Sequence, residues 1–456
     1  MTPHTTEALA RFAASFERSR IPADVRHAAA QCLLNWAGCA LGGAGHPAVE
    51  RAMAALLPFS GAPSASLIGR GERCDPLHAA LFNGISSHVL DFDDTHLATL
   101  VHPSGPVISA ALALAQHQAV DGKRFVDAIA LGIEVECRVA LGVYPAHYDI
   151  GWHITGTAGV FGATAAAGRL LGLDETRMAW ALGIAATQAA GLREMFGTMC
   201  KSLHPGRAAQ GGLNAALMAH AGFTSSTRAI EAPRGFARVT CGDPHLDDVT
   251  SGLGESWEIL KNSYKPYACG VVIHPVIDAC LDLRRSNAFS PDDIAAVELD
   301  VHPLVLELTG KTEPATGLEG KFSVFHAAAI ALLRGESSFR DFTDEAVRDA
   351  NVIALRRRIV AKIVAGTRED EARVTMTLRN GERLSRHVPN ALGSLARPMS
   401  DEDIERKFRD LAQDVLPQAQ IDQAIGLCWK IDEQPDAGRV GAALSPQPQV
   451  SYPTRA

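Results

Sequence analysis

The chain has 456 residues, of which 47% are hydrophobic, and its formal net charge is −8. This composition predicts a globular protein with a large buried core, and the length favours two domains over one. The acidic balance, without any block of lysine or arginine, argues against a nucleic-acid partner, so affinity for acidic ligands must come from local cations.

Cysteine usage and the first residues bear on the cellular compartment. Nine cysteines lie at irregular spacings without a Cys-x-x-Cys pair, which indicates reduced thiols of the cytoplasm and argues against an iron–sulfur cluster or a structural zinc site. The stretch MTPHTTEALARF is polar and acidic, unlike a secretory signal, and no uninterrupted apolar stretch reaches membrane-spanning length. We therefore expect a cytoplasmic protein with no metal and no membrane partner.

Residues 8–256 are dominated by Ala/Leu/Val/Gly segments with helical periodicity, broken at Pro and Gly. These segments predict a large helical domain over residues 1–264. Residues 157–173 (TAGVFGATAAAGRLLGL) and 183–192 have such small side chains that neighbouring helices are expected to approach closely.

The pattern changes after Lys265. Residues 295–301, 373–378 and 384–388 alternate apolar and polar like half-buried strands, and Asn380-Gly381 between the last two is a strong hairpin signal. Residues 359–364 predict one more strand, and residues 321–333 and 344–351 predict helices. The sequence thus predicts a smaller α+β domain over residues 265–398.

The helical pattern returns at Ser400, a predicted N-cap, and continues to about residue 430. Residues 399–432 are therefore expected to complete the helical domain. Residues 433–456 are polar and contain several prolines, which predicts a C-terminal tail. The expected fold class is mainly α, with a large all-helical domain and an inserted, smaller α+β lid domain.

Three histidine-proline steps, His102-Pro103, His204-Pro205 and His274-Pro275, each precede an apolar helical run. Proline suits the first helical position and pushes the residue before it into extended geometry, so each histidine is expected at or near an N-cap. Helix N-termini carry free N–H groups and partial positive charge, which favour carboxylates and hold a nearby imidazole neutral. If the three helix starts converge, they form a pocket for a small polyanion.

The densest polar cluster is Asp91-Phe92-Asp93-Asp94-Thr95-His96, which is followed by His102-Pro103-Ser104. A solvated, acid-rich loop that caps a helix is the structural alternative. The histidine at the next helix start favours a functional site.

The stretch Lys201-Ser202-Leu203-His204-Pro205-Gly206-Arg207 leads into a helix of small residues. Two cations and an imidazole at a helix N-terminus would form a carboxylate receptor, because charge-assisted hydrogen bonds and the helix dipole act together. An exposed basic turn is the alternative. The strongly apolar residues that follow favour a turn packed against the core.

Lys265 stands at the predicted domain boundary, and clefts between domains are common ligand sites. A partly desolvated lysine there could act as a base or an acid, although a hinge lysine at the surface is an equal alternative. His274 follows nine residues later, at the third helix start.

His153, in Trp152-His153-Ile154-Thr155-Gly156, also precedes an Ala/Gly helix. A lone histidine of this kind is more often a hydrogen-bonded core residue than a catalyst, but it repeats the arrangement seen at the other helix starts. Tyr148, just upstream, is a candidate proton donor, although tyrosines near a packed turn are usually structural.

Several common catalytic motifs are missing. The chain has no Gly-x-Gly-x-x-Gly after a strand, no P-loop, no Gly-x-Ser-x-Gly and no His-Glu-x-x-His. Dinucleotide, nucleotide-phosphate, serine-hydrolase and zincin chemistry therefore lose support. Catalysis is expected to use side chains alone, without a cofactor.

At these same residues the chain resembles the MmgE/PrpD family, which includes 2-methylcitrate dehydratase, cis-aconitate decarboxylase and iminodisuccinate epimerase. The matching elements are His88-Val-Leu-Asp-Phe-Asp-Asp-Thr95, His102-Pro-Ser-Gly105, Trp152-His-x-Thr-Gly156, Lys201-x-Leu-His-x-Gly-Arg207, Tyr264-Lys-Pro-Tyr267 with His274, and Lys321-Phe-Ser323. The resemblance implies a helical domain completed by C-terminal helices, an inserted lid, a homodimer and no organic cofactor. It also implies an active site lined by Asp91, Thr95, His102, His153, Lys201 and Lys265. In one departure, Gly270 stands where the decarboxylase has a histidine, five residues after its motif lysine.

The resulting hypothesis is a hydro-lyase that acts on a small di- or tricarboxylate through proton transfer at the carbon next to a carboxylate. His102, oriented by Asp91, is one expected proton carrier, and Lys265 or His153 is the other, on the opposite face. The residues expected to contact substrate are Thr95, Ser104, Tyr148, Lys201, His204, Arg207 and His274.

Other functions stay open at this point. An epimerase of an amino- or imino-dicarboxylate is the second reading, and a decarboxylase of a tricarboxylate is the third. The string Asp91-Phe92-Asp93-Asp94 also matches the Asp-x-Asp-Asp of terpene cyclases, but only 6% of the chain is aromatic, too little for a carbocation pocket. A non-catalytic carboxylate-binding protein is the remaining alternative.

Overall fold

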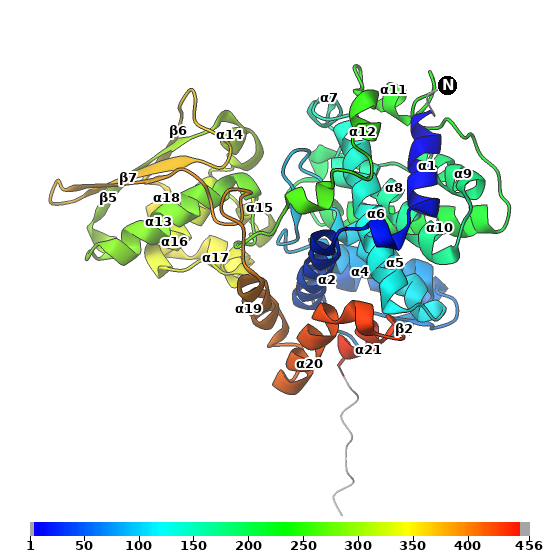
Figure 1. Cartoon of the computed structure of the whole chain (residues 1–456). Helices are drawn as coiled ribbons and strands as arrows, with labels where there is room; N and C mark the ends of the chain where they lie inside the picture. Colours follow the sequence, from blue (N-terminus) through cyan, green and yellow to red (C-terminus); the bar gives the residue numbers. More distant parts are fainter. Residues whose placement is uncertain (1–3, 447–456) are drawn as a thin grey trace, which may run out of the picture.

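The computed structural model describes residues 4–446 and has two lobes, a larger one built of helices and a smaller one that carries a sheet (Figure 1). The larger lobe contains α1 (Thr5–Ser15), α2 (Ala23–Gly43), α3 (Pro47–Leu56), α4 (Pro76–His88), α5 (Ser104–His117), α6 (Gly122–Leu141), α7 (Ala146–Ile150), α8 (Ile154–Leu171), α9 (Glu175–Ala186), α10 (Cys200–His220), α11 (Phe236–Thr240) and α12 (Leu246–Thr250). It also contains two short antiparallel strand pairs, β1 (Ala65–Ser66) with β2 (Arg73–Cys74) and β3 (Thr95–His96) with β4 (Asn262–Ser263).

Helix α8 lies at the centre of the larger lobe, packed against α5, α6 and α10, with nearly all of its side chains buried. Small residues allow this packing, because a Cβ placed on Gly212 of α10 would lie only 2.5 Å from Cβ of Ala163 in α8. The close approach expected for residues 157–173 is therefore confirmed. Residues 183–192 do not form the expected close helix contact. Helix α9 ends at Ala186, and its Gly183 packs against Ser225, which lies in a loop rather than in a helix.

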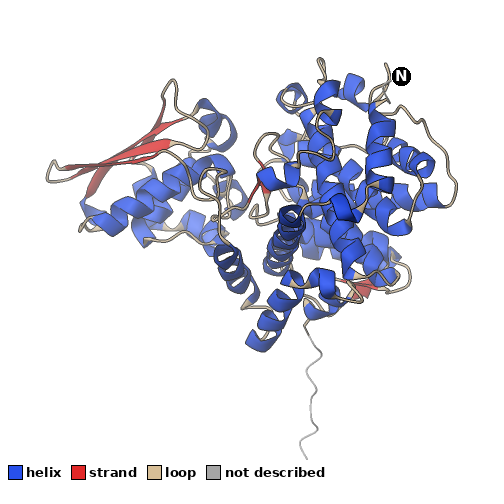
Figure 2. Ribbon diagram, in the orientation of Figure 1, coloured by secondary structure: helices blue, strands red, loops and turns tan. Residues whose placement is uncertain are grey.

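The smaller lobe is an α+β unit (Figure 2). It contains α13 (His274–Ser286), α14 (Pro303–Thr309), α15 (Gly317–Gly320), α16 (Val324–Arg334), α17 (Asp344–Arg348), α18 (Ala350–Arg356) and the strands β5 (Ile294–Val301), β6 (Ile359–Ile363), β7 (Ala372–Leu378) and β8 (Arg383–Val388). The strand order is β6-β5-β7-β8, parallel only between β5 and β6. Residues alternate between buried and accessible along β7, because α13 and α16 pack against one face of the sheet.

Local signals account for the boundaries of these elements. Strands β7 and β8 form the predicted hairpin, with φ of +90° at Gly381, a backbone angle that favours glycine. Ser400 caps α19 (Asp401–Ala412) through a capping box with Asp403, as predicted. Helix α19 then packs against α2, so the chain returns to the larger lobe. The expected fold class, mainly helical with a smaller α+β part, is confirmed.

The C-terminal region differs from the predicted tail. After α20 (Gln418–Trp429), the chain forms α21 (Arg439–Ala443), and both Val440 and Leu444 are buried. The backbone N–H of Gly69 donates to the carbonyl of Leu444 at 2.8 Å. Residues 433–446 therefore pack against the larger lobe, and residues 447–456 of the expected tail lie outside the described residues. Among the described helices, none combines the length and apolar character needed to cross a bilayer.

The step His204-Pro205 does not start a helix. Helix α10 begins at Cys200, so the step lies in its second turn. Proline at this position removes one helical N–H donor, and the preference of the preceding residue for extended geometry is overridden. The neighbouring Gly206 gives the reason: it packs so tightly that a Cβ on Gly84 of α4 would lie 2.6 Å from its Cα. Tertiary packing between α4 and α10 fixes the helical path.

Candidate active site

A strained loop after α4 brings the acidic cluster to the junction of the two lobes. Asp91 and Leu100 have φ of +51° and +60°, the only positive values among the described non-glycine residues. Residues in this region of backbone space are costly and concentrate at functional sites. Within the loop, β3 pairs with β4, with Thr95 opposite Ser263. This pairing brings the acidic cluster next to Lys265, about 170 residues further along the chain.

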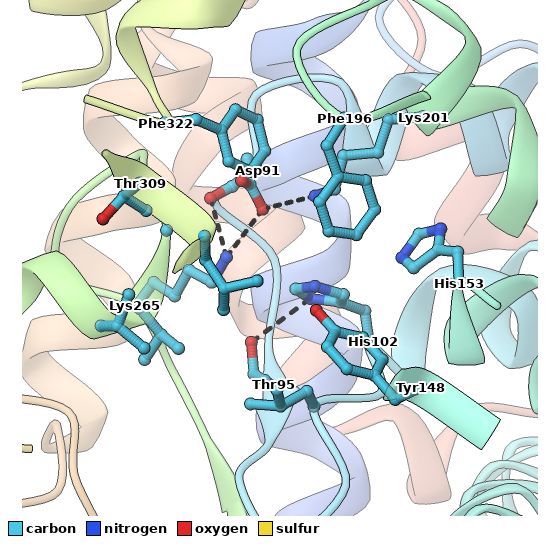
Figure 3. A pocket seen from close by; sticks show the side chains of 15 residues that line it. Asp91, Thr95, His102, Tyr148, His153, Phe196, Lys201, Lys265, Thr309 and Phe322 are labelled. Atoms are coloured by element: carbon cyan, nitrogen blue, oxygen red, sulfur yellow. Dashed lines mark hydrogen bonds and ion pairs between the residues drawn. The ribbon is translucent and has the colours of Figure 1, made fainter. Parts of the chain in front are cut away.

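Two buried lysines share one oxygen of Asp91. Oδ1 accepts from Nζ of Lys265 at 2.8 Å and from Nζ of Lys201 at 3.0 Å (Figure 3). Burial alone would raise the pKa of Asp91, but the two lysines hold it well below its usual value of 3.8. Burial lowers the pKa of Lys201, whereas Asp91 and Asp93 outweigh burial and raise the pKa of Lys265. With all three groups charged, the cluster carries one net positive charge.

Three consecutive backbone carbonyls around Asp91 each accept from a different buried lysine. Nζ of Lys321 donates to the carbonyl of Leu90 at 2.7 Å, Nζ of Lys265 to that of Asp91 at 3.1 Å, and Nζ of Lys407 to that of Phe92 at 2.5 Å. Burial lowers the pKa of Lys321 and of Lys407 to about 8. These charge-assisted bonds explain how the left-handed conformation of Asp91 is held.

His102 stands one residue before the N-cap of α5 and is oriented by the backbone. Its Nδ1 lies 2.8 Å from the carbonyl of Asp94 and 3.3 Å from Oγ1 of Thr95. Because a carbonyl can only accept, Nδ1 carries the proton, and Nε2 keeps its lone pair. Burial and Lys265 lower the pKa of His102 to about 3, although Asp93 opposes the shift. The imidazole is therefore neutral, and Asp94, rather than the expected Asp91, orients it.

A second imidazole, His153, is the N-cap residue of α8 and belongs to a histidine pair. Its Nδ1 lies 2.8 Å from Nδ1 of His204, so one ring donates and the other accepts. Burial and the nearby Lys201 lower the pKa of His153 well below its ordinary value. The rings of His102 and His153 lie 6.5 Å apart between centroids, which leaves both beside the same small space.

These groups line one pocket of about 480 Å³, partly open to solvent, between the lobes. Of the predicted site residues, its wall contains Asp91, Thr95, His102, Tyr148, His153, Lys201 and Lys265. Phe196, Thr309 and Phe322, which are not among the predicted site residues, also line it, and Nζ of Lys201 lies 5.3 and 5.4 Å from the two phenyl ring centres. Burial raises the pKa of Tyr148, so its hydroxyl stays protonated.

Four residues expected to contact substrate lie elsewhere. Ser104 is buried below the pocket and donates its hydroxyl to Asp94, because the start of α5 points into the core. Arg207 is exposed and bonds to Gln210, because α10 begins before Lys201 and turns residue 207 to its outer face. His204 lies behind His153, and His274 lines a neighbouring pocket instead.

Buried carboxylates and histidines beyond the predicted set surround the pocket. His88 Nδ1 lies 2.7 Å from Oδ2 of Asp93, while its buried Nε2 has no hydrogen-bond partner among residues 4–446. Ring nitrogens of His88, His102 and His153 lie within 4.8 Å of one another, as do donor atoms of Asp91, Asp93 and His102. These are the side chains near the pocket that could hold a metal ion.

Comparison with known proteins adds to this geometry. The family model described as the MmgE/PrpD N-terminal domain matches residues 7–248, and the one described as the MmgE/PrpD C-terminal domain matches residues 267–431. The chain is 27% identical to cis-aconitate decarboxylase of Aspergillus terreus over 461 residues, which covers 94% of each chain. It is 27% identical to cis-aconitate decarboxylase of Mus musculus, over 83% of this chain and 80% of the other. It is 25% identical to 2-methylcitrate dehydratase of Escherichia coli strain K12, over 75% of this chain and 73% of the other.

Proposed function

Because the chain belongs to the MmgE/PrpD family and is an enzyme like the relatives named above, we propose that it is a lyase of the hydro-lyase type. Its substrate is a small di- or tricarboxylate, and it moves a proton at the carbon next to a carboxylate. The observation that carries this proposal is the pair of lysines on Asp91, which stand beside two neutral imidazoles in one pocket. Fixed cations and a neutral base are what carbanion chemistry requires.

The cationic cluster binds the substrate carboxylate. Lys201 and Lys265 together outweigh the charge of Asp91, so a carboxylate that enters the pocket meets a net positive site. When the α-proton leaves, negative charge grows on that carboxylate, and the same ammonium groups stabilise it. The pKa of Lys265 is raised by its pairing with Asp91, so this ammonium group stays protonated. We therefore assign Lys265 to charge stabilisation rather than to proton transfer.

His102 is the base in this scheme. Its unprotonated Nε2 takes the α-proton, and the carbonyl of Asp94 keeps the ring in that tautomer. When substrate carboxylates bind, they raise the pKa of His102, because nearby negative charge favours the protonated imidazole. His153 or the hydroxyl of Tyr148 then donates a proton to the leaving hydroxyl, which departs as water and leaves a carbon–carbon double bond.

Two alternatives keep the same machinery. In an epimerase, His102 and His153 would exchange a proton at one carbon, and in a decarboxylase the departing group would be carbon dioxide. A terpene cyclase is not favoured, because the carboxylates of Asp91, Asp93 and Asp94 are bonded to lysines, a histidine and Ser104 rather than open for metal-bound diphosphate. We also propose a homodimer, which sedimentation velocity would test.

The reaction is tested by incubating the protein in deuterated water with hydroxy and imino di- and tricarboxylates and with cis-aconitate. A new alkene absorbance together with loss of the hydroxyl identifies the hydro-lyase. Deuterium uptake without unsaturation identifies the epimerase, and released carbon dioxide identifies the decarboxylase. Absence of turnover and of deuterium exchange with every acid would overturn the proposal.

A further inference from the structure

A second pocket adjoins the first and shares three of its wall residues. Leu100, Val271 and Val272 line both, and the second pocket has a volume of about 840 Å³ against about 480 Å³ for the first. Its other walls come from Leu97, from His274, from residues 369–370 and from the segment at 391–396 that leads back toward α19. The proposed chemistry does not use this space.

The walls of the second pocket differ in character from those of the first. Leucine, valine and alanine side chains dominate, among them Leu97, Leu392 and Leu395. The charged residues in its wall are Glu369 and Asp370, and no lysine or arginine of residues 4–446 lines it. Asp370 pairs with Arg368, so a carboxylate placed here would find no cation in the wall, whereas an uncharged chain would lose unfavourable contact with water.

Two polar side chains in this wall are buried without partners. Nε2 of His274 and Oγ of Ser394 have no hydrogen-bond partner within the described part of the chain, and their residues are 1% and 6% exposed. Burial and Lys265 lower the pKa of His274 to about 3, so its ring is neutral. Buried polar groups without a bond are costly, and a neutral oxygen of a ligand could supply one.

The wall at residues 391–397 is held in place before any ligand arrives. Oδ2 of Asp278 accepts from the backbone N–H of Leu392 at 2.7 Å, and the hydroxyl of Ser263 donates to the carbonyl of Gly393. Gly393 has φ of +85°, and a Cβ there would lie 2.4 Å from the carbonyl oxygen of Tyr264, so only glycine fits. A preformed wall favours binding because little order is lost.

We infer that the substrate of this enzyme carries an uncharged, largely apolar substituent that extends past Leu100 and Val271 into the second pocket. The substrate class is an alkyl-substituted dicarboxylate, with at most a neutral oxygen on the substituent. This inference rests on the proposed function, because the first pocket must bind the carboxylates. It predicts selection against acids whose distal end is charged.

Isothermal titration calorimetry with three acids tests the inference: succinate, butylsuccinate and tricarballylate, which replaces the butyl group with a carboxymethyl group. We expect butylsuccinate to bind at least tenfold more tightly than succinate, because apolar area is buried. Tricarballylate should gain no more than threefold. If butylsuccinate binds no better than succinate, or tricarballylate binds better than butylsuccinate, the inference is wrong.

Variants in the second pocket localise the effect. Ala396→Trp fills the pocket from an exposed position, and Leu395→Asn makes its wall polar. Each should reduce the preference for butylsuccinate at least fivefold and leave succinate binding unchanged, which also shows that the variant is folded. Leu56→Asn, at an exposed leucine on α3 outside the pocket, is the control. A preference that survives both pocket variants would also overturn the inference.

The results separate this inference from the proposed function. If none of the three acids binds, both proposals fail. If succinate binds and deuterium exchange with carboxylates is observed, but the butyl group adds nothing, the proposed function stands and only the inference falls.

Discussion

Lys265 and Asp91 are joined twice, since the same ammonium group donates to the carboxylate Oδ1 at 2.8 Å and to the backbone carbonyl at 3.1 Å. The bond to Oδ1 pairs the ammonium group with the carboxylate of Asp91 at the pocket wall. The bond to the carbonyl holds the backbone that orients this carboxylate. Lys265 also lies between β4 of the larger lobe and α13 of the smaller one. One side chain therefore contributes both to the electrostatics of the pocket and to the segment that connects the lobes.

Asp91→Asn should destabilise the protein and abolish most activity. The change leaves Lys201 and Lys265 buried with too little counter-charge, and breaking a buried ion pair costs about 3–5 kcal/mol of the free energy of unfolding. Urea unfolding measures this loss. Glu255→Gln, at an exposed glutamate, is the control and should change the free energy of unfolding by less than about 0.5 kcal/mol. Equal stability of Asp91→Asn and the wild type would contradict the charge cluster described here.

Lys201 and Arg207 offer a matched test on one helix. Lys201→Gln removes a cation from the pocket and should raise KM by about 10- to 100-fold, because a hydrogen bond to a charged group is worth about 1.5–3 kcal/mol. Arg207→Gln makes the same charge change at an exposed position and should leave KM within about twofold. Steady-state kinetics on the turned-over acid compares the two, and a larger effect at Arg207 would return that residue to the binding site.

His102→Gln should remove the base while preserving the fold. We expect kcat to fall by about 10²- to 10⁴-fold, the usual contribution of a positioned proton carrier. Thermal unfolding should stay close to wild type, because the glutamine amide can still donate to the carbonyl of Asp94. His220→Gln, at the exposed end of α10, is the control. Normal deuterium exchange at the α-carbon in the His102 variant would assign the base elsewhere.

Acid should destabilise the protein between pH 6.5 and about pH 4. Burial, with Lys265 nearby, lowers the pKa of His102 and of His274 to about 3, and burial lowers that of His147 and of His326 to about 4. Below pH 6.5 the histidines of the unfolded chain bind protons, whereas these histidines stay neutral in the native chain. The free energy of unfolding present above that pH is therefore lost as pH falls. Each group contributes a slope of at most about 1.4 kcal/mol per pH unit.

Urea midpoints at pH 7.5, 6.5 and 5.5 test this dependence. The midpoint should change little between the first two and fall clearly at the third. Carboxylates with depressed pKa values, such as Asp75, act only at lower pH and do not contribute in this window. Burial raises the pKa of Asp94 to about 6 and that of Glu134 to about 7, which opposes this trend because these carboxyls bind protons in the native chain before they do in the unfolded one. A midpoint that rises at pH 5.5 would show that the imidazoles do not dominate the dependence.

Much of the fold could be read from local patterns. Alternation located the strands of the smaller lobe, Asn380-Gly381 located its hairpin, and Ser400 marked the start of α19, because each signal depends on neighbours along the chain. The pocket placement of Asp91, His102 and Lys265 could be predicted because the acidic cluster precedes a helix start and Lys265 stands at the predicted domain boundary.

The remaining features depend on contacts that no local pattern encodes. Pro205 favours a helix start, but the packing of Gly206 against α4 carries the helix through it and turns Arg207 outward. No local pattern predicts the contacts of Lys321 and Lys407, since the carbonyls that they bind lie 231 and 315 residues away. The sequence also could not show that the backbone of Asp94, rather than the side chain of Asp91, orients His102.

Nζ of Lys407, where the chain has returned to the larger lobe, donates at 2.9 Å to the carbonyl of Lys265, where it departed. This hydrogen bond joins the two ends of the smaller lobe beside Asp91. The proposed proton carriers, His102, His153 and Tyr148, all lie outside that lobe. Gly270, Thr309 and Phe322, by contrast, belong to it. Replacing residues 266–398 with those of a relative should therefore change which acids the enzyme accepts, while the lysines and imidazoles around Asp91 stay in place. Substrate preference can then diverge without a change in the residues that move protons.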